Sequence, residues 1–214
     1  MKAAGNLKIP TILIGNFTWY DIYSHFPEAK NETHLIQSLA EEYSHSTLQI
    51  LPQCHLDNKV IHHKKEVGFI ANNGKNMRND LVSFLGKKAE NKFLVFIYLG
   101  EHGTRTVNWS NLRNNKDCLF LTRDPIKHPD VHFIDDKFSY HDLIASSDTT
   151  LTKGGYSTLA TSFANHKPVI TCERDDFYEF KAVREYLQKR QIGIIVKNAP
   201  FKQGDWQEPI KEAL

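Results

Sequence analysis

Residues 143–171 read LIASSDTTLTKGGYSTLATSFANHKPVIT, and they follow a pattern of strand, turn, helix and strand. Buried strands are expected over residues 148–151 and 168–171, and Gly154 and Gly155 form the turn between the first strand and the helix. The helix is predicted by side chains that recur at helical spacing on one face, namely Tyr156, Leu159, Ala160, Phe163 and Ala164.

A glycine turn that leads from a strand into a helix can bind an anion. The helix N-terminus presents N–H groups and partial positive charge, and glycine lets a phosphate approach the backbone closely. The hydroxyls of Ser157 and Thr158 lie in the first turn, where they can donate to the same oxygens. Two interpretations are open at this point: a phosphate site, or a tight turn that binds nothing.

Composition excludes several classes of function. The chain has 214 residues, enough for one large domain or two small ones, and its formal net charge of +2 gives no reason to expect a nucleic-acid partner. No apolar run approaches the roughly 20 residues of a membrane-spanning helix, and the N-terminus lacks a signal-peptide core.

The cysteines and histidines indicate no metal site. Cys54, Cys118 and Cys172 are far apart and odd in number, so they fit neither a zinc spacing nor a disulfide framework. The 11 histidines include a single His-x-x-x-His spacing, at His128 and His132, and we expect the histidines to be scattered surface or core residues. We therefore expect no metal, a reducing compartment and a cytoplasmic location.

Strands alternate with helices through residues 67–197, which predicts an α/β fold with a Rossmann-like, doubly wound parallel sheet. The strands are expected over residues 67–71, 93–99, 118–121, 131–134, 148–151, 168–171 and 193–196, and two earlier ones over residues 11–14 and 48–51. Helices are expected over residues 31–44, 79–88, 139–146 (with Ser139 as N-cap) and 206–214, and after the charged loop at residues 173–176.

The polar, aperiodic residues 52–65 are the expected domain boundary, and we divide the chain into residues 1–62 and 63–214. Near the N-terminus, a helix is expected to end on a glycine cap at Gly5. A stable helix needs several turns, so we expect an α/β unit that starts upstream of Met1. A fragment, a wrongly assigned start and one half of a split protein all fit this expectation.

Two other strand ends carry candidate binding residues. Gly100 and His102 lie in a second glycine turn, after the apolar run at residues 93–99, but Glu101 would repel a phosphate there. Because carboxyl ends of parallel strands share one edge of a sheet, both glycine turns are expected to face one cleft. The stretch NFTW (residues 16–19) is either a binding lip or a cover for the sheet edge, and we favour the cover.

Three stretches resemble GT-B glycosyltransferases of the MurG-like kind, mainly their C-terminal, nucleotide-sugar-binding domain. DTTLTKGGYSTLAT (residues 148–161) resembles that family's D-x-x-(V/I)-x-(K/S)-x-G-(Y/A)-x-T-(V/L)-x-E segment. HKPVITCER (residues 166–174) resembles its G-x-P-x-(L/I)-x-x-P-R segment. NFTWYDIY (residues 16–23) is similar to a stretch in a subgroup of these proteins and in the glycosyltransferase-like half of plant arabinokinases.

The resemblance implies a donor site for a nucleotide-sugar, with uridine as the expected nucleotide. Residues 1–62 would be the remnant of an acceptor-type domain, and residues 63–214 the donor-binding domain. Phosphate contacts would come from the segment that starts at Gly154, and the base or sugar contacts from the residues after the second strand. The implied donor-site residues are Gly154, Gly155, Tyr156, Ser157, Thr158, Glu173, Arg174, Phe177 and Glu179, with Gly100 and His102 from the other turn.

The chain also departs from the family pattern. Thr161 stands where the family has a ribose-binding Glu, and a hydroxyl cannot accept the two hydrogen bonds that a carboxylate can. The family's Glu-Gln pair is Glu179 and Phe180 here. The pattern assigns no catalytic base to this chain, so a partner chain or an upstream domain would complete the cleft.

Three functions follow from these observations. The first is transfer of a sugar from a nucleotide-sugar, expected to be UDP-linked, to an unknown acceptor hydroxyl, by this chain or with this chain as the donor-binding part. The second is a non-catalytic nucleotide-sugar-binding subunit of a split transferase. The third is a nucleotide-sugar hydrolase or epimerase on the same scaffold, because a fold does not fix its chemistry.

Overall fold

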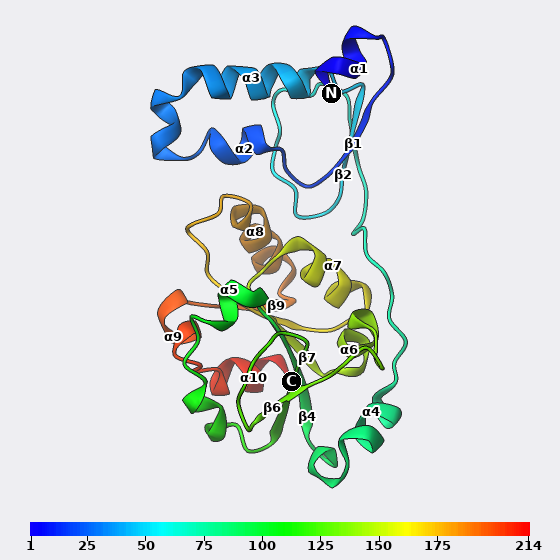
Figure 1. Cartoon of the computed structure of the whole chain (residues 1–214), viewed down its shortest axis with the longest axis vertical. Coiled ribbons are helices and arrows are strands. Elements are labelled where there is room, and N and C mark those ends of the chain that lie inside the picture. Colours follow the sequence, from blue (N-terminus) through cyan, green and yellow to red (C-terminus); the bar gives the residue numbers. More distant parts are fainter. The chain divides into compact units, whose positions relative to one another are not determined.

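A computed structural model describes residues 1–214, apart from the side chain of Lys30, and the chain forms two compact units. The first unit comprises Met1–Ile70 and Asp175–Tyr186, and the second comprises Ala71–Arg174 and Leu187–Leu214. Each unit contains its own all-parallel sheet (Figure 1).

The second unit is built on six parallel strands. They are β4 (Phe93–Tyr98), β5 (Cys118–Thr122), β6 (Val131–Phe133), β7 (Thr149–Thr152), β8 (Val169–Cys172) and β9 (Gly193–Val196). Their order across the sheet is β6-β5-β4-β7-β8-β9, with every neighbouring pair parallel. The chain thus winds outward from β4 in one direction, returns, and winds outward from β7 in the other. This order confirms the doubly wound parallel sheet predicted from the sequence.

Helices cover both faces of this sheet, as a parallel sheet requires. Val95 and Ile97 of β4 belong to one buried cluster with Phe201, Trp206 and other residues of α9 (Asn198–Lys202), α10 (Gln207–Ala213) and η3 (Trp109–Asn114). Leu94 and Phe96 belong to another with α4 (Arg78–Leu85) and α6 (Tyr140–Ser146). Alternate side chains of a strand point to opposite faces, so the two clusters are two layers of core. Figure 1 shows these helices on the two sides of the strands.

The remaining elements of this region are shorter or lie at the ends of strands. They are η2 (Lys87–Ala89), α5 (Gly100–Thr104) and α7 (Tyr156–Ala164), whereas α8 (Phe180–Arg190) belongs to the first unit up to Tyr186 and to the second from Leu187. The N-cap predicted at Ser139 is confirmed, because its hydroxyl accepts a hydrogen bond from the N–H of Asp142 at 3.1 Å. Nowhere in the described part of the chain is a helix long and apolar enough to cross a membrane.

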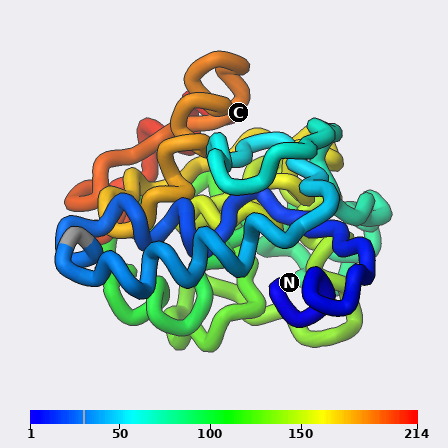
Figure 2. The backbone as a smooth tube through the Cα atoms, turned by 90° about the horizontal axis from the view of Figure 1, so that it is seen from above, coloured from blue at the N-terminus to red at the C-terminus, as the bar shows by residue number. Residues whose placement is uncertain are grey.

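The first unit has a three-stranded sheet in the order β1 (Ile12–Ile14), β2 (Leu48–Leu51) and β3 (Lys64–Glu66). Its helical elements are α1 (Lys2–Asn6), α2 (Trp19–Tyr23), η1 (Pro27–Asn31) and α3 (Thr33–Ser44). Helices α2 and α3 run beside each other, and the Trp19 N–H donates to the Tyr43 hydroxyl at 3.3 Å (Figures 1 and 2).

The strand predicted over residues 67–71 is wrong: the strand of this region is β3, a few residues earlier. Its pairing with β2 ends where the Val67 N–H donates to the Leu51 carbonyl at 2.9 Å. All three side chains of β3 are exposed and charged, so the backbone pairing, not a buried face, holds it. A prediction based on apolar residues therefore placed the strand too late.

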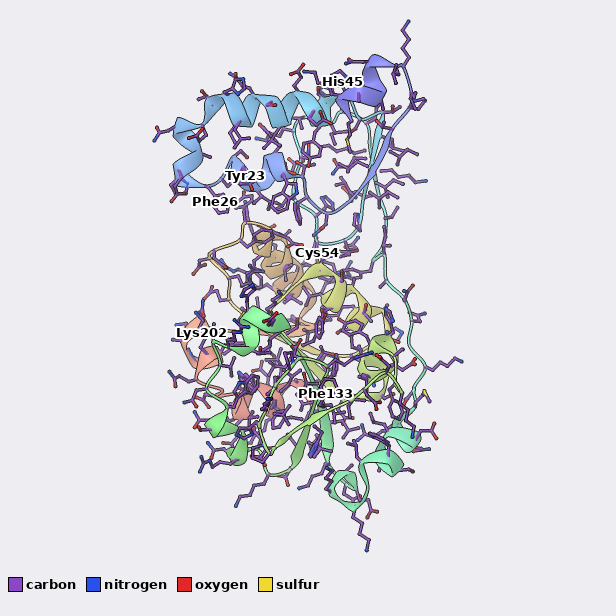
Figure 3. All side chains as sticks on the ribbon, viewed as in Figure 1. Tyr23, Phe26, His45, Cys54, Phe133 and Lys202 are labelled. Atoms are coloured by element: carbon purple, nitrogen blue, oxygen red, sulfur yellow. The ribbon has the colours of Figure 1, made fainter. Side chains whose placement is uncertain are left out.

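The glycine cap predicted at Gly5 is also wrong. Gly5 lies inside α1, which ends on Leu7. A Cβ at Gly5 would lie 2.5 Å from Nδ1 of His45, so the glycine is needed for close packing and not for a left-handed turn. Figure 3 shows His45 beside α1.

Residues 52–65, the expected domain boundary, lie within the first unit, and Lys64 and Lys65 belong to β3. Asn58 is fully buried, and its side-chain carbonyl accepts from the N–H groups of Val60 and Ile61 at 2.8 and 3.0 Å. Its amide donates to Thr18 and Asp21. This internal hydrogen bonding replaces a periodic apolar pattern, and it is the reason why the first unit extends to Ile70 and not only to residue 62.

We predict unequal stability effects at two apolar strand positions. Phe96 is 0% exposed and Ile14 is 59% exposed. Phe96→Ala is expected to lower the free energy of unfolding by roughly 3–5 kcal/mol, since it removes buried contacts and leaves a cavity. Ile14→Ala is expected to cost less than about 1 kcal/mol. Urea denaturation of both variants measures this, and equal costs would contradict the packing described here.

Candidate functional site

The N-terminus of α7 presents backbone N–H groups that lack an acceptor among the described residues. Gly154 has a φ of 84°, a left-handed conformation that favours glycine, and Gly155 is the N-cap with no side-chain capping bond. The first hydrogen bond of the helix runs from the Leu159 N–H to the Gly155 carbonyl at 3.2 Å. Within the part of the chain that the structure describes, the N–H groups of Gly155, Ser157 and Thr158 donate to no acceptor.

Space is available in front of these amides. A Cβ at Gly155 would meet no atom within 4 Å, and Ser157 is exposed. The helix terminus is therefore uncovered at Gly155 and Ser157, whereas Gly154 and Thr158 are buried. An anion could approach the N–H groups directly, in the manner known for helix N-termini.

The two glycine turns lie side by side. Strands β4 and β7 are neighbours in register, and Tyr98 pairs with Thr152 at their carboxyl ends. Gly100 follows β4 and has a φ of 71°, and Gly154 follows β7. Because the strand order reverses between β4 and β7, this is the topological switch point, where open α/β sheets place their ligands.

In the turn after β4, a buried carboxylate already accepts the hydrogen bonds of the backbone N–H groups. Asp124, just after β5, accepts from the N–H groups of Leu99 at 2.6 Å and Gly100 at 3.0 Å. Burial raises the pKa of Asp124, whereas these two hydrogen bonds and the nearby Lys153 oppose the rise. The N–H of Gly100, which the resemblance assigns to the donor site, is thus engaged within the protein. His102 is exposed on α5.

The two hydroxyls of the first turn of α7 have different surroundings. Ser157 is exposed, while Thr158 is buried and accepts a hydrogen bond from the Tyr140 hydroxyl at 2.8 Å. Burial raises the pKa of Tyr140 to about 12, so this hydroxyl stays a donor at neutral pH. The bond ties α6 to the start of α7. Of the two hydroxyls, only that of Ser157 faces solvent.

Thr161 does not take the place of a ribose-binding carboxylate. It is 3% exposed, and its hydroxyl donates to the Ser157 carbonyl one turn earlier at 2.8 Å. Its side chain therefore completes the backbone hydrogen bonding of α7.

The other implied donor-site residues divide between the two units. Glu173 and Arg174 follow β8 in the second unit, where the Glu173 N–H donates to the Val196 carbonyl at 2.8 Å. Phe177 and Glu179 belong to the first unit. Glu179 is buried and accepts from the Asn16 side-chain amide at 2.6 Å. The structure therefore brings together Gly100 and residues 154–158, and it assigns Phe177 and Glu179 to the other unit.

The NFTW stretch forms the start of a helix that the sequence analysis missed. Thr18 caps α2, and the Asp21 carboxylate accepts from the Thr18 N–H at 2.7 Å, which completes a capping box. Phe17 packs edge-on against Phe177, with ring centroids 5.7 Å apart. The Thr18-x-x-Asp21 spacing was the available signal for this helix.

A separate hollow of about 510 Å³ lies within the first unit. It is lined by Tyr20, Asp21, Ser24, His25, His55, Leu56, Asp57, Lys59, Tyr178, Lys181, Ala182 and Glu185. His25 and Tyr178 are stacked, with ring centroids 3.5 Å apart. Its lining carries side chains of both signs of charge, so it favours no class of ligand.

These features define the class of fold. The six-stranded, doubly wound parallel sheet with a second, smaller parallel sheet is the α/β architecture of GT-B glycosyltransferases, as the sequence predicted. No family model matches the chain.

Solved structures and one curated protein resemble the chain at low identity. The spinosyn forosaminyltransferase SpnP superposes with a TM-score of 0.65 and 18% identity, over 99% of this chain and 63% of that one. UGT2 of Phytolacca americana, solved with UDP-2fluoro-glucose and pterostilbene, gives a TM-score of 0.60 and 12% identity, over 99% and 62%. L-arabinokinase of Arabidopsis thaliana is 23% identical over 217 residues.

The chain spans only part of the length of each of these proteins. The arabinokinase match covers 100% of this chain but 21% of that protein, and the two solved structures are covered to less than two thirds of their length. The likeness to the solved structures therefore shows the fold.

We predict that Tyr140→Phe lowers stability mildly at neutral pH. The variant loses the bond to Thr158, which costs about 1 kcal/mol. The raised pKa has a second consequence: the folded state favours protonated Tyr140, so the contribution of this group is complete below about pH 10 and is lost as the pH rises towards 12. The wild-type protein is thus expected to lose more stability than the variant between about pH 9 and about pH 11.

Urea denaturation of both proteins at a series of pH values measures this difference. Cys54 and Cys118, whose pKa values burial raises to about 12 and about 11, also titrate there. They are present in both proteins, so their effect cancels in the comparison. Identical alkaline losses in the two proteins would show that Tyr140 is not buried as described.

Proposed function

We propose that the second unit binds the diphosphate of a nucleotide-sugar, with UDP as the nucleotide, and that the chain is the donor-binding part of a glycosyltransferase. The observation that carries this proposal is the set of N–H groups from Gly155, Ser157 and Thr158, which lack an acceptor among the described residues and lie at the switch point. The similar Phytolacca protein was solved with a UDP-sugar, and the similar spinosyn enzyme is named for the transfer of a sugar, which supports the same interpretation.

In the proposed reaction, an acceptor hydroxyl attacks the anomeric carbon of the donor. The bond from that carbon to the phosphate oxygen breaks, and the nucleoside diphosphate leaves with the electron pair and gains negative charge. N–H groups fixed at a helix terminus stabilise charge that grows in the transition state, because they need no reorganisation. This chain would thus contribute to catalysis by stabilising the departing nucleoside diphosphate.

The other half needs a general base to take the proton of the acceptor hydroxyl. We assign that base to an acceptor domain, on the same or another polypeptide, and we leave the acceptor and the sugar open. The cysteines are free thiols, which suits the reducing cytoplasm that we propose as the location.

The affinity for UDP can be estimated from the number of hydrogen bonds that the free N–H groups would donate. A bond from a neutral donor to a charged acceptor contributes roughly 1.5–3 kcal/mol. Three such bonds contribute roughly 5–9 kcal/mol, and after the lowest cost of association, about 4 kcal/mol, they give a dissociation constant for UDP of roughly 0.2 mM or weaker. Isothermal titration of the whole chain with UDP, GDP, ADP and uridine measures it. The proposal fails if a folded sample binds none of the nucleoside diphosphates.

We predict that Gly155→Asp abolishes UDP binding while it leaves the fold intact or more stable. The new side chain enters open space, and Asp is a good N-cap that accepts from the N–H groups of the first turn. It would therefore stabilise the helix by a few tenths of a kcal/mol, occupy the proposed phosphate donors and repel the ligand.

Gly68→Asp is the matched control, because Gly68 also has open space around it and lies in the other unit. It adds the same charge and is expected to change UDP affinity less than about twofold. Thermal unfolding of both variants separates a blocked site from a damaged fold. Unchanged UDP binding by Gly155→Asp would place the ligand elsewhere.

A further inference from the structure

Lys153 lies between the two glycine turns, and neither the sequence pattern nor the resemblance assigned it a role. It follows β7 directly, precedes Gly154, and is exposed. A Cβ at Gly100 would lie 3.3 Å from the Lys153 Nζ, so the ammonium group extends across to the turn after β4. The side chain therefore spans the switch point from one strand end to its neighbour.

Among the described residues, the ammonium group of Lys153 forms no ion pair, although a nearby charge attracts it. Among the described residues, no acceptor lies within hydrogen-bond distance of the Lys153 Nζ. The buried Asp124 carboxylate attracts Lys153 while its Oδ2 accepts from the N–H groups of Leu99 and Gly100. The positive charge can thus still bind an anion that enters the switch point.

Glu101, the acidic residue of the turn after β4, has a positively charged partner of its own. Glu101 forms an ion pair with Arg105 one helical turn later on α5. This pair removes much of the repulsion that the sequence predicted for a phosphate near Gly100. The N-terminus of α7 and the ammonium group of Lys153 then both contribute positive charge near the two turns.

We propose that Lys153 binds the diphosphate together with the N-terminus of α7, and that Asp124 is a positioning residue that keeps the ammonium group over Gly100. The inference rests on the proposed function and adds a residue to its site. The amides contribute only partial charges, whereas a diphosphate carries about two or more full negative charges. A full positive charge at the switch point balances the leaving group as the bond to the sugar breaks.

The test compares Lys153→Gln with the wild-type chain by isothermal titration with UDP. Loss of one bond between charged partners is expected to weaken UDP binding roughly 10- to 100-fold. Lys153→Arg, which keeps the charge, is expected to recover most of the affinity. The salt dependence of UDP binding should become shallower in Lys153→Gln, which a purely structural role would not cause.

Lys87→Gln is the matched control. Lys87 is exposed on η2, shortly before the amino end of β4 and so at the opposite edge of the sheet. Its replacement removes the same charge and should alter UDP affinity less than about twofold. An equal loss in both variants would show an effect of net charge alone and would overturn the proposal.

Asp124→Asn tests the positioning role. It is expected to weaken UDP binding several-fold in the wild-type background and to have no further effect on Lys153→Gln, because the two residues act through one group. Additive losses would contradict this coupling.

The outcomes separate this inference from the proposed function. If the wild-type chain binds no nucleoside diphosphate, the proposed function fails. If the wild-type chain binds UDP and Lys153→Gln binds it within about twofold of the same affinity, only the role of Lys153 fails.

Discussion

Parallel pairing between β4 and β7 is the constraint on which the candidate site depends. The other strands extend the sheet outward from these two central strands, whose register sets Tyr98 opposite Thr152. The chain therefore emerges from both strands at one edge, with a glycine of positive φ shortly after each. The connections leave in opposite directions, so the space above this pair stays free of crossing chain. Helix α7 starts at the border of that space, and three amides at its start have no acceptor among the described residues.

Prediction from the sequence succeeded where a buried element has a recognisable pattern of apolar side chains. The run at β4 is buried on both faces and was found as a strand within one residue of its observed end. The strands of the first unit leave a weaker signal, because Ile12 and Ile14 are exposed and β3 carries only charged side chains. Its strand register depends on backbone hydrogen bonds, which any residue except proline can make. For that reason the third strand was predicted at residues 67–71 and not at Lys64–Glu66, and residues 52–65 were predicted to be the domain boundary.

The candidate site was predictable only in its local part. The turn at Gly154 and Gly155 is contiguous in the sequence, so glycine, hydroxyl and helix signals occur together. The contacts of Asp124 with Gly100, of Tyr140 with Thr158 and of Asn16 with Glu179 join residues far apart in the chain. They depend on strand order and on register, which no periodicity reveals. The division of the implied donor-site residues between two units was hidden for the same reason.

Under the proposed function, the contacts at the site favour recognition of the phosphates over recognition of the nucleoside. Two hydroxyl side chains of α7 are engaged in hydrogen bonds within the protein. Thr161 donates to the backbone of its own helix, and Thr158 accepts from Tyr140. The groups that can donate near the start of α7 include main-chain amides, the exposed Ser157 hydroxyl and the exposed Lys153 ammonium, and such donors suit anionic oxygen. Such groups distinguish a diphosphate from a neutral ligand but do not distinguish one base from another. Under the proposed function, selection of the nucleotide would depend on residues other than those of the α7 turn, and Glu173 and Arg174, which follow the neighbouring strand β8 in the same unit, are polar candidates.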